Sequence, residues 1–397
     1  DLDKPEGYSK ETAEAILQRY DYSGEAEAQK DDTSEGAIVP DDILVIMNES
    51  WADLSCAGDF ETNIPYNEFY TNLTENTIKG TACVSIYGGN TPQSEYEFLT
   101  GNTISFLPSG AIAYNLYIKK DTPSLVAQLS EQGYECIAMH PEKATNFNRN
   151  QVYPRLGFLQ FLTEDDFTDV VKIRELCSDQ SVYDKMIDLY ENKQEGQKLF
   201  LYGVTMQNHG GYTYEGEDFT PLVQTVGLNK TYDKVNQYLT CMRYTDEALE
   251  NLIGYFSDVD EHVMIVMFGD HHGDVGSDFY EELYGKKLID VEGEQYETRY
   301  ETPFFIWTNY EIEEKADEKI SLNYLSTLAM QTANIPLTEY QSFLAELQSH
   351  YPVISAAGIY DAEGNFYTWN NVEESADYSY MKEYQILEYY MLENYKK

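Results

Sequence analysis

Five short apolar runs, separated by helical patterns, constrain the fold of this chain most strongly. Each run has the length of a strand and is apolar nearly throughout, as in strands that are buried on both faces. The runs are DILVIMNES (42–50), ECIAMH (135–140), KLFLYGVTM (198–206), HVMIVMFGD (262–270) and TPFFIWTN (302–309). Helical patterns cover 122–133, 181–193 and 229–256. This alternation predicts an α/β fold, a mainly parallel central sheet flanked by helices on both faces.

The remaining segments divide the chain into three parts. Residues 1–40 comprise an amphipathic helix around Lys10–Tyr20 and a polar acidic arm, EAEAQKDDTSEGA, without hydrophobic periodicity. Residues 41–335 form the predicted α/β domain. Residues 336–397 contain a helical pattern, LTEYQSFLAELQ, a hairpin signal around Asp361–Gly364 and a tyrosine-rich helix. We expect this last part to be a small α+β subdomain.

The charge balance restricts the partners of the protein. The chain has 70 acidic and 26 basic residues and a formal net charge of -44. Nucleic acid is excluded as a partner, because binding to phosphates requires a basic surface. Simple electrostatic adhesion to an anionic membrane is excluded for the same reason. An anionic substrate would need a local positive centre, such as a metal ion or a cluster of Arg and His.

The cysteines and the hydropathy pattern limit the structural class. Five widely spaced cysteines, none in a CxxC pair, predict buried thiols rather than a disulfide framework or a thiolate zinc site. No segment reaches the roughly 18 consecutive apolar residues of a membrane-spanning helix. A cytosolic protein, a mature secreted protein and an excised soluble domain all fit this pattern.

Polar residues follow four of the five predicted strands. They are Glu49 and Ser50, His140, Gln207 to His209, and Asp270 to His272. Functional residues of open parallel sheets gather at the carboxyl ends of the strands, so we expect a site at this edge. Carboxylate and imidazole together suit a divalent ion such as zinc or manganese, which makes Asp270, His271 and Glu49 candidate metal ligands. Each of these residues alone could equally be a solvated side chain.

Two further motifs contain groups that could react with or bind an anion. In GGNTPQSEYEFLTG (88–101), Thr91 stands where a helix is expected to begin, and its hydroxyl could attack phosphorus or sulfur beside a metal. The alternative is that Thr91 only caps this helix. His140 and Arg149 share the loop HPEKATNFNR, and His209 precedes two glycines in MQNHGGY. The fork of an arginine matches phosphate, whereas His262 and His350 read as structural or surface residues.

Taken together and in this order, these motifs resemble those of lipoteichoic acid synthases and related phosphoglycerol transferases. That family is sulfatase-like and belongs to the alkaline phosphatase superfamily. The resemblance extends over residues 42–310 and, more weakly, to about residue 370. It implies an enzyme in which Thr91 attacks the phosphorus of phosphatidylglycerol and releases diacylglycerol. A glycerophospho-threonine intermediate then passes its glycerophosphate to a lipoteichoic-acid-type polymer or a glycolipid.

The resemblance also implies the roles of individual residues. Residues matching Glu49, Thr91, Asp270 and His271 hold one divalent ion, with Mn²⁺ expected and Zn²⁺ or Mg²⁺ open. Residues matching His140, Arg149 and His209 hold the glycerophosphate. Phe147 stands where the family usually has Trp, so one possible indole N–H donor to the substrate is missing. Family members carry N-terminal transmembrane helices, so the chain is expected to be a soluble ectodomain on the extracellular face of a Gram-positive-type bacterial membrane.

Other functions stay open at this point. A phosphoethanolamine transferase or a phosphodiesterase would use the same fold. A sulfatase would normally carry Cys or Ser in a C/S-x-P-x-R context, and GNTPQSE lacks the Arg. A non-catalytic domain that binds teichoic acid or a glycan is a further alternative. The headgroup that turns over, and the metal content, would distinguish these functions.

Overall fold

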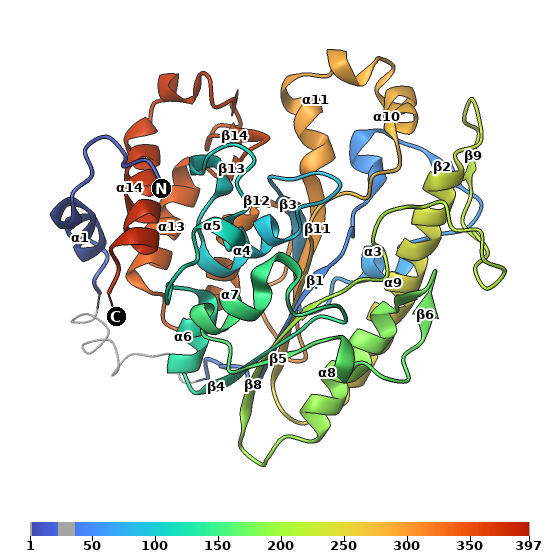
Figure 1. The fold of residues 1–397 in the computed structure, drawn as a ribbon, viewed down its shortest axis with the longest axis horizontal. Coiled ribbons are helices and arrows are strands. Elements are labelled where there is room, and N and C mark those ends of the chain that lie inside the picture. The colour runs from blue at the N-terminus through green and yellow to red at the C-terminus, as the bar shows by residue number, and fades with distance from the viewer. Residues whose placement is uncertain (1, 23–35, 397) are drawn as a thin grey trace.

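The computed structural model describes residues 2–22 and 36–396 and contains one large central sheet (Figure 1). The eight strands lie in the order β12-β3-β11-β10-β1-β8-β4-β5. Their bounds are β1 (Asp42–Asn48), β3 (Thr77–Cys83), β4 (Tyr134–Met139), β5 (Gln160–Leu162), β8 (Lys198–Val204), β10 (Val263–Gly269), β11 (Glu301–Thr308) and β12 (Lys315–Ser321). All five predicted strands are therefore present.

The direction of the strands confirms a mainly parallel sheet. Strands β10, β1, β8, β4 and β5 run parallel to one another. Strand β11 is antiparallel to both β10 and β3, while β12 is parallel to β3. The carboxyl ends of β10, β1, β8 and β4 consequently meet at one edge of the sheet.

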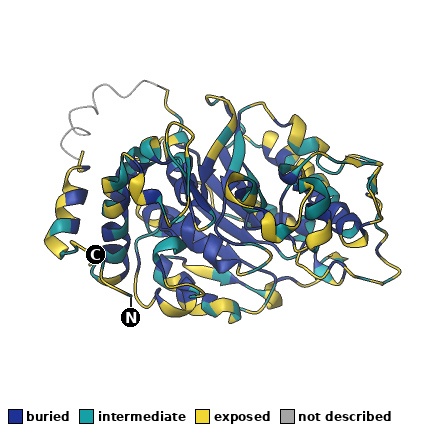
Figure 2. Ribbon diagram, turned by 90° about the horizontal axis from the view of Figure 1, so that it is seen from above, coloured by how far each residue is buried: buried dark blue, intermediate teal, exposed yellow. Residues whose placement is uncertain are grey.

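Helices cover both faces of the sheet and produce two apolar cores. One core contains Ile43 and Val45 of β1, and the other contains Leu44 and Ile46, because successive side chains of a strand point to opposite faces. Helices α8 (Asp179–Glu191) and α9 (Asp233–Ser257) cover the second face. Helices α4 (Pro92–Thr100), α6 (Leu125–Glu131) and α7 (Arg149–Leu156) cover the first. Figure 2 shows the sheet and the inner sides of these helices as the buried part of the molecule.

The C-terminal elements complete the first core. They are α12 (Leu325–Thr332), α13 (Glu339–His350), β13 (Val353–Ser355), β14 (Gly358–Tyr360), β15 (Phe366–Tyr367) and α14 (Tyr378–Glu393). Strands β14 and β15 are antiparallel, which confirms the predicted hairpin around residues 361–364. Side chains of α13 and α14 share one core with β1, and both helices contact α1 (Lys10–Gln18). This C-terminal part thus packs on the sheet itself.

The predicted N-terminal helix is present as α1, and Ser9 caps it by accepting a hydrogen bond from the backbone N–H of Thr12. Residues 25–35 of the predicted acidic arm lie outside the described residues. The short elements are β2 (Glu61–Thr62) paired with β9 (Thr225–Val226), β6 (Lys172–Ile173) paired with β7 (Leu176–Cys177), α3 (Glu68–Asn72), α5 (Ala113–Leu116), α10 (Ser277–Tyr284) and α11 (Gly293–Glu297).

Two sequence predictions about the class of the chain can be compared with this fold. All five cysteines are free thiols, as predicted. Within residues 2–22 and 36–396, none of the helices combines the length and the apolar character needed to cross a bilayer.

Candidate metal and nucleophile site

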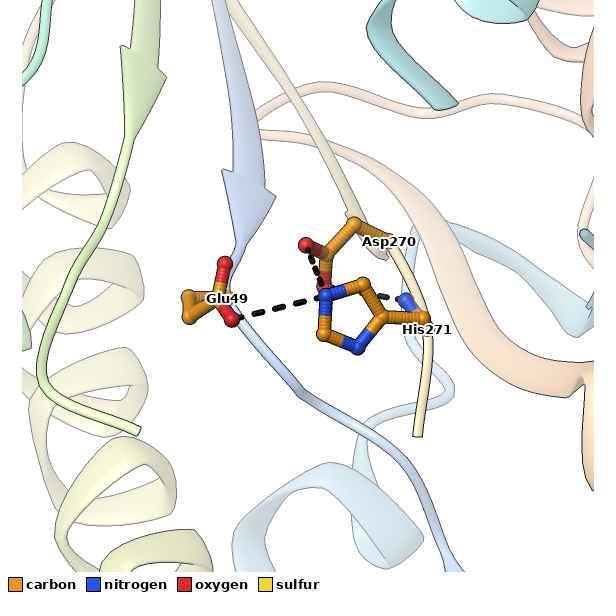
Figure 3. Close-up of side chains that lie close together, drawn as sticks. All are labelled: Glu49, Asp270 and His271. Carbon is orange, nitrogen blue, oxygen red and sulfur yellow. Dashed lines mark hydrogen bonds and ion pairs between the residues drawn. The ribbon is translucent and has the colours of Figure 1, made fainter. Parts of the chain in front are cut away.

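Glu49, Asp270 and His271 lie together at the carboxyl edge of the sheet (Figure 3). Strands β1 and β10 are parallel neighbours with Asn48 opposite Gly269, so both chains leave the sheet at the same level. The Nε2 atom of His271 lies 3.1 Å from Oδ2 of Asp270 and 3.5 Å from Oε1 of Glu49. All three side chains are buried. The structure therefore brings together three of the four predicted metal ligands through sheet register alone.

Backbone groups fix the carboxylate of Asp270. A Cβ atom on Gly269 would lie 1.7 Å from the carbonyl oxygen of Trp51, so only glycine lets these two chains approach so closely. The N–H groups of Ser50 and His271 both donate to Oδ1 of Asp270, at 2.7 and 2.9 Å. The other carboxylate oxygen, Oδ2, is buried, accepts no hydrogen bond and has the imidazole of His271 at 3.1 Å as its charged neighbour. A buried carboxylate oxygen that faces an imidazole nitrogen fits a metal ligand.

Thr91 is the fourth predicted ligand and the predicted nucleophile. Its backbone is already helical, with φ -38° and ψ -43°, and its side chain makes no capping hydrogen bond. Instead, Oγ1 donates to Oε2 of Glu49 at 3.2 Å and lies 3.4 Å from Nε2 of His271. The interpretation of Thr91 as a simple helix cap is therefore wrong. The hydroxyl points at the three-residue cluster.

Helix α4, which Thr91 precedes, is buried along its whole length. All nine of its residues are buried, including Glu95 and Glu97. The hydroxyl of Ser94 donates to the backbone carbonyl of Asp270 at 2.7 Å, which links this helix to the end of β10. Such contacts fix the nucleophile relative to the cluster, as a preorganised site requires.

The electrostatics of the cluster favour a cation. Burial and the neighbouring Asp270 raise the pKa of Glu49 to about 8. Burial opposes the charged form of His271, but the carboxylates of Asp270 and Glu49 outweigh it and raise the pKa of this imidazole to about 9. Nδ1 of His271 lies 2.7 Å from the carbonyl of His272, which orients Nε2 toward both carboxylates. One imidazole nitrogen, two carboxylates and a hydroxyl are a donor set that fits a divalent ion such as Mn²⁺ or Zn²⁺.

A second group of predicted residues lies beside this cluster. Nδ1 of His140, after β4, is 2.9 Å from the carbonyl of Val204. Burial and the positive charge of Arg149 lower the pKa of His140 to about 3, so its imidazole is neutral. Arg149 is only 2% exposed, and its Nε and Nη2 donate to Oε2 of Glu95 at 3.0 and 2.6 Å. Glu95 follows Thr91 by one helical turn, so Arg149 is tied to the helix of the nucleophile.

Phe147 and His209 form the more exposed side of this group. Phe147 and Asn148 both have left-handed backbones, with φ of 53° and 62°, and the Phe147 ring is 39% exposed. The guanidinium of Arg149 lies 5.6 Å from the centre of that ring. His209 is exposed, and its backbone carbonyl accepts a hydrogen bond from Arg174 at 3.0 Å. The structure thus gathers the four residues predicted to bind substrate, while that role stays a prediction.

Several residues that shape the site were missed in the sequence. Thr205 accepts the N–H of Glu49 at 2.9 Å, and Ser94 and Glu95 act as described above. Ser94 and Glu95 belong to the SEYE segment directly after Thr91. This position was the only feature of the sequence that could have indicated their role in the site. His272 was predicted as one of the polar residues that follow a strand. It is fully buried, with Nδ1 2.8 Å from the hydroxyl of Tyr280 and Nε2 2.7 Å from the carbonyl of Glu301.

The other two histidines lie away from the cluster, as predicted. The side chain of His262 is partly exposed, 3.9 Å from a carboxylate oxygen of Asp41. Nδ1 of His350 lies 2.9 Å from a carboxylate oxygen of Asp377 in the C-terminal part.

A mainly parallel sheet thus carries a buried carboxylate–imidazole cluster and an adjacent threonine hydroxyl at one edge. The sulfatase family model matches residues 41–335, and the chain belongs to this family. A Rhizobium meliloti protein named for modification of cyclic beta-1,2-glucan is 28% identical over 323 residues, which are 79% of this chain and 49% of that protein. Lipoteichoic acid synthase of Staphylococcus aureus is 29% identical over 211 residues, 50% of this chain and 31% of that protein.

Solved structures confirm the fold. The Streptococcus pyogenes phosphoglycerol transferase GacH, in complex with sn-glycerol-1-phosphate, superposes with a TM-score of 0.76 at 23% identity and covers 98% of this chain and 94% of its own. The lipoteichoic acid synthase LtaP of Listeria monocytogenes has a TM-score of 0.62 at 18% identity, over 88% and 90% of the two chains. The present chain spans about half or less of the length of the curated relatives described above.

Proposed function

We propose that this chain is the catalytic part of a metal-dependent phosphoglycerol transferase that moves glycerophosphate from phosphatidylglycerol to an acceptor hydroxyl. The observation that carries the proposal is the direction of the Thr91 hydroxyl. It makes no capping bond and faces Glu49 and His271 from the first turn of a buried helix. A hydroxyl in this position is arranged to act as a nucleophile rather than to stabilise the helix.

In the first step, Oγ1 of Thr91 forms a bond to phosphorus, and the bond from phosphorus to the diacylglycerol oxygen breaks. The proton of the threonine hydroxyl leaves with the diacylglycerol. A divalent cation, expected to be Mn²⁺, would be held by Glu49, Thr91, Asp270 and His271, and would favour the ionised hydroxyl and offset charge on the phosphoryl oxygens.

The second step regenerates the enzyme. An acceptor hydroxyl forms a bond to phosphorus, the bond from phosphorus to Oγ1 breaks, and the acceptor proton returns to Thr91. His209 is exposed beside the site and is the residue we assign to carry that proton or to bond the glycerol hydroxyls. Neutral His140 and the guanidinium of Arg149 would orient the glycerophosphate.

The comparisons support this proposal through the names of the similar proteins. Two solved neighbours are a phosphoglycerol transferase and a lipoteichoic acid synthase, and one was solved with a glycerophosphate. The soluble domain of a phosphoethanolamine transferase of Neisseria meningitidis also aligns, with a TM-score of 0.50 at 11% identity. An ectodomain at the outer face of a bacterial membrane, anchored by helices beyond this chain, agrees with such neighbours and is part of the proposal.

Turnover of two lipid analogues tests the function. Phosphatidylglycerol and phosphatidylethanolamine analogues are incubated with the wild type and with Thr91→Ala, with added Mn²⁺ or with a chelator. We expect Mn²⁺-dependent release of diacylglycerol from the glycerol headgroup only, and its loss in Thr91→Ala. Thr71→Ala is the matched control, because the exposed Thr71 hydroxyl bonds the backbone carbonyl of Asn67 within α3 and not a residue of the cluster.

The alternatives give different results. Turnover of the ethanolamine analogue would agree with the proposed mechanism but would show that the donor is phosphatidylethanolamine rather than phosphatidylglycerol. Water as the sole acceptor would indicate a phosphodiesterase. No turnover of either lipid, together with no bound metal, would contradict the proposal and favour a non-catalytic domain that binds teichoic acid or a glycan.

A further inference from the structure

A cluster of aromatic side chains and one arginine lies next to the loop that carries Thr91. Tyr87 precedes this loop, and the N–H of the following residue, Gly88, donates to the carbonyl of His272 at 3.2 Å. The ring of Tyr87 also contacts the ring of His272, with centroids 6.2 Å apart. Since His272 directly follows the metal ligand His271, Tyr87 is only one side chain away from the cluster.

The guanidinium of Arg299 lies close to the rings of Tyr87 and Tyr280. It is 4.1 Å from the centre of the Tyr87 ring and 4.9 Å from that of Tyr280. Nε is buried without a hydrogen-bond partner. In the described part of the chain, no ion pair joins Arg299 to a carboxylate, and the neighbouring Glu297 and Glu301 pair with Lys319 instead. An arginine held by aromatic rings and left without a carboxylate keeps donors available for another molecule.

Two more tyrosines extend the cluster toward solvent. The ring of Tyr300 lies 6.3 Å from that of Tyr87, and the ring of Tyr296 lies 5.4 Å from that of Tyr300. Tyr296 belongs to α11 and is 39% exposed. Figure 1 shows α11 beside α10, beyond the ends of β11 and β3. We refer to Tyr87, Tyr296, Arg299 and Tyr300 as the aromatic shelf.

The charges around the shelf indicate what it can bind. A Cβ atom on Gly88, the residue after Tyr87, would lie 3.4 Å from the Cβ of Asp274, so an exposed carboxylate stands beside the shelf. Exposed Glu292 and Glu294 stand next to Tyr296 in the chain. These carboxylates repel an anionic polymer and accept hydrogen bonds from neutral hydroxyl groups. The shelf therefore fits a ligand with an apolar face and a neutral, hydroxyl-rich edge.

We propose that the aromatic shelf binds a neutral sugar ring of the acceptor, so that a glycan hydroxyl rather than the end of a glycerophosphate chain receives the transferred group. The sugar ring stacks on Tyr296 and Tyr300, while Arg299 and Asp274 bond its hydroxyls. This inference rests on the proposed function for the identity of the transferred group. The binding of the sugar itself does not depend on it.

Kinetics with two acceptors test the shelf. The probes are a neutral β-linked gluco-oligosaccharide and a glycerophosphate oligomer, each with the phosphatidylglycerol analogue as donor. In Tyr296→Ala and Arg299→Ala we expect the KM for the oligosaccharide to rise about three- to tenfold, as for a lost aromatic contact, with kcat unchanged. Release of diacylglycerol to water should stay at the wild-type rate. Tyr296→Trp should restore the KM, and Tyr22→Ala, which alters another exposed tyrosine, should not change it.

Calorimetric titration of the oligosaccharide keeps this test separate from the donor. Weaker binding of the oligosaccharide to Tyr296→Ala than to the wild type supports the shelf, whether or not the lipid analogue turns over. Absence of lipid turnover would reject only the proposed function. An unchanged KM and unchanged binding in both variants would overturn the inference. So would a wild type that prefers the glycerophosphate oligomer by kcat/KM.

Discussion

Different kinds of structure hold the metal cluster and the neighbouring residues predicted to bind substrate. We refer to His140, Phe147, Arg149 and His209 as the substrate group. Glu49, Asp270 and His271 follow the ends of two adjacent parallel strands. Backbone N–H groups fix the carboxylate of Asp270, and the N–H of Glu49 donates to the hydroxyl of Thr205. His140 and His209 lie on loops that follow strands, whereas Arg149 begins helix α7, and the buried carboxylate of Glu95 holds its guanidinium. The predicted metal ligands thus follow the ends of rigid strands and Thr91 begins a buried helix, whereas His140 and His209 stand on loops, which can vary without disturbing the chemistry.

The largest effect should come from removing one charge of the rigid cluster. Asp270→Asn keeps an oxygen that can accept the N–H groups of Ser50 and His271 but loses the negative charge. We expect loss of bound metal and a fall in turnover of about 10²–10³-fold or more. Elemental analysis and the lipid assay measure both effects.

Asp246→Asn provides the control for that substitution. Asp246 also accepts two backbone N–H groups, from Phe69 and Tyr70, but lies outside the cluster. Its variant should bind metal and turn over lipid like the wild type. Full metal occupancy in Asp270→Asn would show that the three-residue cluster is not the metal site.

The second effect concerns the support of the substrate group. Glu95→Gln leaves the guanidinium of Arg149 buried without its counter-charge, so the free energy of unfolding should fall by about 3–5 kcal/mol. The control is Glu14→Gln, which removes the partly exposed i,i+4 pair with Lys10 and should change stability by less than about 0.5 kcal/mol. Urea denaturation compares them. Equal stability of Glu95→Gln and the wild type would mean that Glu95 does not hold Arg149.

The two regions also differ in how far the sequence predicts them. The strand-end residues were predictable, because apolar runs locate the strands and parallel strands bring their ends together. The pair of Glu95 and Arg149 was not, since 54 positions separate two charges that both read as exposed. Strand β3 was missed because Lys79, Gly80 and Thr81 interrupt its apolar pattern. Gly80 is needed there because a Cβ atom would lie 1.9 Å from the carbonyl of Glu318. His271 of the FGDHHG motif was predicted as a metal ligand, whereas the role of His272 could not be predicted without the packing that buries it.

A third effect, smaller and dependent on pH, concerns the contact between α14 and α4. Glu388 accepts hydrogen bonds from the hydroxyl of Tyr96 at 2.7 Å and the N–H of Thr103 at 3.0 Å, and burial raises its pKa to about 8. Because the folded pKa is above the unfolded value, near 4.5, the stabilisation is complete below about pH 4.5 and is lost as the pH rises through 8.

Denaturation of Glu388→Gln and the wild type between pH 5 and 8 measures that effect. The amide does not ionise, so the variant should gain stability relative to the wild type as the pH rises, by up to a few kcal/mol at about 1.4 kcal/mol per pKa unit. A constant difference over this range would mean that Glu388 ionises in the folded protein as in the unfolded chain.

The smallest effect should come from the exposed edge of the substrate group. Phe147→Trp adds an indole N–H at a half-exposed position beside Arg149 without changing the aromatic character of the residue. We expect the KM for the phosphatidylglycerol analogue to fall about threefold, as for one added hydrogen bond, with kcat unchanged. Steady-state kinetics measure it, with Phe147→Leu as the variant that adds no donor. The same KM in both variants would place residue 147 away from the headgroup.

The central claim is that Thr91 carries the glycerophosphate, and one measurement tests it most directly. The wild type is incubated for a single turnover with phosphatidylglycerol labelled in its headgroup, without acceptor, then quenched and digested. The account predicts label on the peptide that contains Thr91 and none in Thr91→Ala. Release of diacylglycerol at the normal rate with no labelled peptide, or with label on another residue, would contradict it.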